Sequence, residues 1–163
     1  MPHSNWDSTI NNLQRQIQTL EELVSQAQYS QSDEVKQALA RFLVVRTSGY
    51  LEQVVSACIR EYLTHCSSPA VTNFGLSWLT HGLSPKPDQL IKLVGRFDNG
   101  MAESLKSFLD KEDALLRREL TFLVDRRNKI AHGVNESVGI RKALDLLEYS
   151  RRITKWFICN LGP

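Results

Sequence analysis

Apolar side chains recur along the chain at steps of three and four rather than two, which is the spacing of amphipathic helices. From Ser8 to Ala27 they mark one face of a helix whose other face carries Asn, Gln and Glu, so this helix should cover a core from outside. Ser32, followed by acidic side chains, is a suitable N-cap for a second helix that reaches about His65. That second helix is apolar almost all the way round, which predicts a central, buried position.

The middle of the chain predicts short helices. Residues 67–100 contain prolines and glycines around short apolar pieces, so we expect an insertion there. One short helix should lie before Pro87 and another over residues 88–97. Residues 101–109 continue with helical spacing.

The C-terminal third predicts two long helices. An amphipathic helix from Glu112 to His132 should end at Gly133, because glycine readily adopts the left-handed backbone that follows many helices. Ser137 is expected to cap a last helix that ends near Gly162.

Together these elements predict an all-α fold, a bundle of four to five main helices with a short helical insertion. We expect a single domain over residues 1–163, with an accessory N-terminal helix over 1–31 and the insertion over 67–100. A chain of this length buries roughly 70% of its unfolded surface, so it needs no disulfide or metal to hold a core.

Composition excludes several classes of protein. The longest uninterrupted apolar run, Phe42 to Val45, is far shorter than the ~20 residues that span a membrane. The N-terminus has no secretory signal pattern. Cys58, Cys66 and Cys159 are an odd number without metal-site spacing, so we expect a cytoplasmic protein with no metal and no cofactor.

Charge is unevenly distributed, although the formal net charge is only +2. Residues 1–110 carry nine Lys and Arg against eleven Asp and Glu, a balance of −2. Residues 111–163 carry eleven against seven, a balance of +4. The C-terminal third is therefore where a polyanionic partner would bind.

One charged residue interrupts an apolar stripe. On the helix over 112–132, Arg127 falls among the aliphatic side chains Leu116, Leu120, Leu123, Val124 and Ile130. Burying an unpaired charge costs several kcal/mol, so Arg127 must meet a carboxylate, line a polar cleft or face a second subunit. Asn128 and His132 are four residues apart and lie together at the edge of that stripe.

A purely structural explanation is also open. Arg127 could pair with a buried glutamate, for which Glu52 on the central helix is the candidate, and a histidine at a helix end is favoured by the helix dipole. Arg46 also lies on an apolar stripe, which predicts a second buried polar contact. In the insertion, Trp78 and His81 form either an exposed recognition loop or local packing.

The segment over residues 127–133, RNKIAHG, resembles the Rx4-6H motif of the HEPN superfamily. The segment over 40–52 is similar to an early helix of bacterial RiboL-PSP-HEPN proteins. The resemblance spans about Ser32 to Leu161 and leaves the first helix outside. It implies a dimeric, metal-independent endoribonuclease, often in toxin–antitoxin or phage-defence systems, although some members have lost cleavage and act as scaffolds.

The residues suit that chemistry, because RNA carries its own nucleophile, the 2′-hydroxyl. His132 can act as base or acid near neutral pH, and Arg127 offers a planar fork to phosphate oxygens. Asn128 can orient the histidine or donate to phosphate. Related nucleases place an acidic residue in a position similar to that of Glu52.

One histidine cannot be base and acid in the same step, so we expect a homodimer that brings two copies of the site together. Some related toxins carry a modified tyrosine two residues after the histidine. Here that residue is Val134, which indicates a different antitoxin or regulatory protein, or none. The expected RNA-binding cations are Arg126, Lys129, Arg46, Arg117 and Arg118, together with Arg141, Lys142, Arg151, Arg152 and Lys155.

Overall fold

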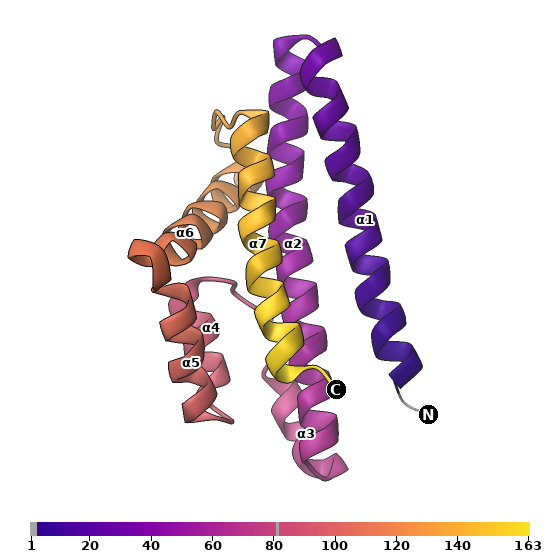
Figure 1. Ribbon diagram of the computed structural model, residues 1–163, viewed down its shortest axis with the longest axis vertical. Helices are drawn as coiled ribbons and strands as arrows, with labels where there is room; N and C mark the ends of the chain where they lie inside the picture. Colours follow the sequence, from indigo (N-terminus) through magenta and orange to yellow (C-terminus); the bar gives the residue numbers. More distant parts are fainter. Residues whose placement is uncertain (1–2, 81) are drawn as a thin grey trace.

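A computed structural model describes residues 3–80 and 82–163, and every regular element in these ranges is an α-helix (Figure 1). The helices are α1 (His3–Ser30), α2 (Asp33–Cys66), α3 (Pro69–Ser77), α4 (Pro87–Val94), α5 (Asn99–Leu109), α6 (Lys111–Ala131) and α7 (Ile140–Leu161). The predicted all-α class is confirmed. His81 lies outside the described residues.

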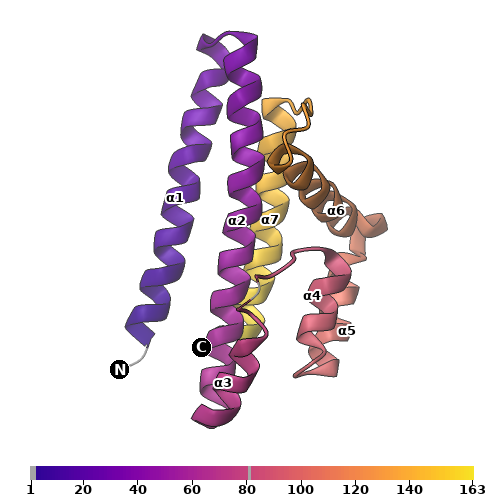
Figure 2. The ribbon, with the colours of Figure 1, turned by 180° about the vertical axis from the view of Figure 1, so that it is seen from behind.

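The longest helix, α2, is the centre of the molecule. It packs against α1, α3, α6 and α7, and α1 and α7 run along it in both ribbon views (Figures 1 and 2). Leu43 and Leu51 of α2 and Phe157 of α7 are fully buried between them. Ser32 caps α2 as predicted, since its side chain accepts a hydrogen bond from the Val35 N–H at 3.4 Å. The predicted central position is confirmed.

The insertion over residues 67–100 contributes two short helices, α3 and α4, and α5 begins at its end. α3 lies against the end of α2, and the approach is close enough that a Cβ on Gly75 would stand 2.8 Å from Leu63 Cδ1. α4 and α5 pack on each other beside the bundle, below α6 (Figure 1). Asp98 caps α5 by accepting from the Met101 N–H at 2.8 Å.

Two predicted helix starts differ from the structure. Residues 112–114 have left-handed backbone, with φ of 55° to 57°, so the regular part of α6 starts after a turn out of α5. Ser137 does not cap α7. Residues 134–139 form an irregular connection that buries Val138, and its last residue, Gly139, has extended backbone and is the N-cap. Gly133 has φ of +76°, as predicted for the residue that ends α6.

The three cysteines are free. Cys58 is buried in α2, and burial raises the pKa of its thiol to about 12, so this residue serves packing rather than chemistry. Within the described ranges, no helix combines the length and the hydropathy that a membrane span requires.

Candidate functional site

Arg127 lies half-buried on the side of α6 that faces α2. Its side chain lines two adjoining clefts. The first, of about 210 Å³, is shared with Leu13 of α1 and Arg46 of α2. The second, of about 320 Å³, is shared with Asn128, Glu52 and the loop over residues 82–85. Of the three environments that the sequence allowed, Arg127 therefore occupies a polar cleft.

Within the described part of the chain, Arg127 forms no ion pair. Its Nη1 donates to Oδ1 of Asn128 at 3.1 Å. Glu52 lines the same cleft, but its Oε1 accepts from the Ser48 hydroxyl at 3.1 Å. The two side chains form no ion pair in the described ranges, so the predicted structural pair is wrong, and the Glu52 carboxylate is hydrogen-bonded by Ser48 one turn earlier on α2.

His132 is exposed at the C-cap of α6. Its backbone N–H donates to the Asn128 carbonyl at 3.0 Å. The Asn128 side chain instead holds Arg127, so Asn128 orients the guanidinium rather than the imidazole. The trio lies at one end of one helix as predicted, with the histidine open to a second molecule.

Arg46 is exposed and lines the 210 Å³ cleft beside Arg127. The predicted buried contact of Arg46 is wrong, because α1 and α2 leave this cleft between them rather than closing over the side chain. The two guanidiniums therefore share one cleft that is open to solvent.

Most of the expected RNA-binding cations form ion pairs within the protein. Arg126 and Lys129 both pair with Glu136 in the connection between α6 and α7, the lysine at 2.9 Å. The other pairs are Arg117 with Asp88 and Asp110, Lys142 with Glu119, Arg151 with Glu21, and Arg152 with Glu112. These contacts join helices or helix ends, so these cations already have carboxylate partners within the protein.

Two of these pairs change the pKa of a partner. Arg117 donates to Asp110 and lowers the pKa of that carboxyl. Glu21 accepts from Arg151 and raises the pKa of that guanidinium. Among the expected cations, Arg46, Arg118, Arg141 and Lys155 are exposed and form no ion pair in the described ranges.

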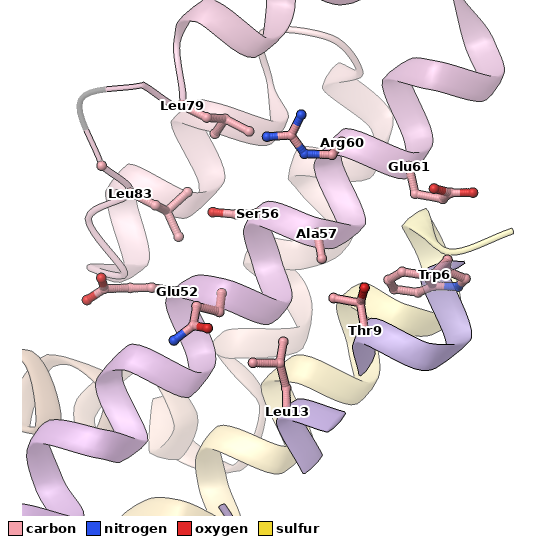
Figure 3. Close-up of a pocket in the computed structure, with 12 residues that line it drawn as sticks. Trp6, Thr9, Leu13, Glu52, Ser56, Ala57, Arg60, Glu61, Leu79 and Leu83 are labelled. Carbon is pink, nitrogen blue, oxygen red and sulfur yellow. The ribbon is translucent and has the colours of Figure 1, made fainter. Parts of the chain in front are cut away.

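A larger groove of about 610 Å³ continues from the Glu52 cleft along α2. Figure 3 shows Glu52, Ser56 and Arg60 on successive turns of α2, pointing toward the loop that carries Leu79 and Leu83. The groove contains both signs of charge. Among residues 3–80 and 82–163, no group of three or more His, Cys, Asp or Glu side chains is placed to hold a metal ion.

Three features of this region were missed from the sequence. Glu136 neutralises two cations, Ser48 hydrogen-bonds Glu52, and Arg96 lies over the exposed ring of Trp78. Only the Ser48–Glu52 spacing of four residues carried a signal in the sequence. The other contacts join different elements.

These observations define a class: an all-α bundle in which an arginine that has no carboxylate partner among the described residues lies in a cleft and an exposed histidine ends the same helix. The model of the RiboL-PSP-HEPN family matches residues 8–157, and the chain belongs to that family. The match includes most of α1, which our sequence comparison left outside. Searches of curated proteins and of solved structures gave no match.

Proposed function

We propose that the protein is a metal-independent endoribonuclease. The 2′-hydroxyl of the substrate attacks the adjacent phosphate, the P–O5′ bond breaks, and the products carry a 2′,3′-cyclic phosphate and a 5′-hydroxyl. Arg127 stabilises the charge that develops on the phosphate oxygens, and His132 takes or gives the proton. Because the substrate supplies the nucleophile, no metal-bound water is needed.

The proposal rests mainly on the surroundings of Arg127. It is half-buried in a cleft, it is held by a neutral amide, and no carboxylate neutralises it in the described chain. A guanidinium in that state keeps its fork available for an anion with two oxygens, such as phosphate. Family membership supports the same chemistry, since HEPN domains are often ribonucleases.

A second copy of the chain would complete the site. Val35 and Phe42 of α2 are 40% and 52% exposed, and Val134 is 50% exposed. Arg41 donates to Asn135 at 2.6 Å, which brings the residue after Val134 to the part of α2 that carries Phe42. Val134 follows His132 by two residues, and exposed apolar side chains there support a two-fold dimer in which one histidine acts as base and the other as acid.

The test is incubation of the purified protein with total RNA in excess EDTA. We expect cleavage that persists in EDTA and disappears in Arg127→Ala and in His132→Ala. The products should end in 2′,3′-cyclic phosphate and 5′-hydroxyl, and a 2′-deoxy nucleotide at the cleavage position should block the reaction. No cleavage by the wild-type protein across RNA classes would favour a helical scaffold instead.

The shared site has a separate test. Mixed dimers of wild-type and His132→Ala chains should lose most activity per dimer, because each active site needs the histidines of both chains. Undiminished activity per wild-type chain would contradict a composite site. A role in toxin–antitoxin or phage-defence systems stays part of this proposal and would be checked by expression in cells, which should arrest growth only with Arg127 and His132 intact.

A further inference from the structure

The end of α3 carries an exposed aromatic pair. Phe74 is 69% and Trp78 is 53% exposed, and their rings meet edge to face with centroids 6.5 Å apart. The Arg96 guanidinium, which follows α4, lies 4.2 Å from the centroid of the Trp78 ring. Arg96 thus fixes the orientation of an indole that the bundle does not bury.

Beside this ring lies a cleft of about 240 Å³, lined by Trp78, Gln89, Lys92, Arg96 and the loop residues Leu83 and Ser84, among others. The described residues that line it include two cations and no carboxylate. Neither Lys92 nor Arg96 forms an ion pair in the described ranges. The cleft is smaller than the roughly 300–1,000 Å³ of whole small-molecule sites, so it suits one part of a larger anion.

This 240 Å³ cleft adjoins the 320 Å³ cleft that Arg127 lines. Gly82, Leu83 and Ser84 line both of them, so a single stretch of loop separates Trp78 from Arg127. An RNA strand with one phosphate at Arg127 needs to cross only this loop to reach the indole. Both clefts present cations, which favours one polyanion that occupies the two.

We propose that Trp78, Lys92 and Arg96 form a nucleotide-binding subsite for single-stranded RNA, an inference that rests on the proposed ribonuclease function. A base flanking the cleaved bond stacks on the face of the Trp78 ring opposite Arg96, and the adjoining phosphate is bound by Lys92 and Arg96. Only an unpaired nucleotide exposes a base face in this way, so the subsite selects single strands over duplexes. Two cations that form no ion pair in the described ranges, in a cleft whose described lining has no carboxylate, favour RNA over an apolar protein partner.

The experiment measures binding of a fluorescein-labelled 12-nucleotide 2′-O-methyl RNA, which has no free 2′-hydroxyl and is not cleaved, by fluorescence anisotropy. Trp78→Leu should raise Kd about tenfold, and Trp78→Phe, which keeps a ring, should raise it less. Arg96→Ala and Lys92→Ala should each lower the slope of log Kd against log salt by about 0.7. A duplex of the same sequence should bind more weakly than the single strand.

Tyr29→Leu is the matched control, because Tyr29 is an 88% exposed aromatic at the far end of α1 and should leave Kd unchanged. Equal Kd values for wild type and Trp78→Leu would overturn the subsite. Combined with weakened binding by Arg127→Ala, that result would leave the proposed function standing. Altered self-association of Trp78→Leu in sedimentation, with unchanged RNA binding, would assign the surface to a protein partner. Trp78-dependent binding without any cleavage would support the subsite and contradict the ribonuclease proposal.

Discussion

The cations of this protein fall into two groups that look alike in sequence. Arg117, Arg126, Arg151 and Arg152 each pair with a carboxylate from another element. Arg127, Arg46 and Arg96 lie in clefts and form no ion pair in the described chain. The first group holds helices together, and the second retains positive charge where an anion can reach it.

Net charge is a poor guide to where RNA would bind on this protein. The C-terminal third has the basic excess, but the structure uses most of those charges internally. Two of the cations in clefts, Arg46 and Arg96, come from the acidic part of the chain. Partner carboxylates, rather than cation counts, decide which charges stay available.

The largest expected effect separates the two groups by cleavage. Arg127→Ala should lower the single-turnover rate about 100- to 1,000-fold, because a donor to the developing charge is lost. Arg152→Ala, which removes a pair with Glu112, should change the rate less than about threefold. Equal losses of rate in the two variants, at equal fractions of folded protein, would contradict the division of the cations into two groups.

Loss of a paired cation should affect the free energy of unfolding more than loss of an unpaired one. Arg151 of α7 donates to Glu21 of α1 at 2.6 Å, and both side chains are 30% exposed. Arg151→Ala should lower the free energy of unfolding by about 1 kcal/mol. Arg46→Ala should change it by less than about 0.5 kcal/mol, because Arg46 lines an open cleft and forms no ion pair in the described ranges. Urea denaturation followed by circular dichroism measures both, and a larger loss for Arg46→Ala would contradict the assignment.

Salt dependence sharpens the distinction further. Each cation that contacts a single-stranded phosphate contributes about 0.7 to the slope of log Kd against log salt. Arg46→Ala should lower the slope by about that amount, whereas Arg117→Ala should leave it unchanged. Anisotropy titrations at several salt concentrations supply the slopes. Slope changes of equal size would place Arg117 on the RNA as well.

The smallest expected effect is the dependence of stability on acidic pH. Arg117 lowers the pKa of Asp110 below its ordinary 3.8, so the ionised carboxyl stabilises the folded state above that pH. This contribution should be lost as pH falls through the lowered pKa. The stability difference between wild type and Asp110→Asn should therefore be present at pH 6 and vanish in stronger acid. A difference that stays constant with pH would show that it does not come from the charge of Asp110.

Much of the fold could be predicted from local patterns. The helix periods, the Ser32 cap and the left-handed Gly133 depend on neighbouring residues, and all three are confirmed. Ser137 was wrong as a cap, because the connection continues past it through the buried Val138 and α7 begins only after Gly139. The unusual position of Arg127 was also visible, since it rests on the 3.6-residue period of one helix.

The partners in the site were not predictable in the same way. Arg151 meets Glu21 across 130 positions of sequence, and Arg117 meets Asp88 across 29. Glu52 was the candidate partner of Arg127 from its place on the central helix, and in the structure its carboxylate is hydrogen-bonded by Ser48. Likewise, the exposure of Trp78 depends on where α3 docks rather than on its own sequence neighbours.

The sequence by itself determined that this chain is a helical bundle with a guanidinium inside an apolar stripe, because hydrophobic periodicity and caps act over a few residues. Only the tertiary structure decided which positive charges are neutralised and which line clefts. The physical reason is that an ion pair needs two side chains within a few ångströms, and for most of these pairs that proximity exists only after distant helices have packed.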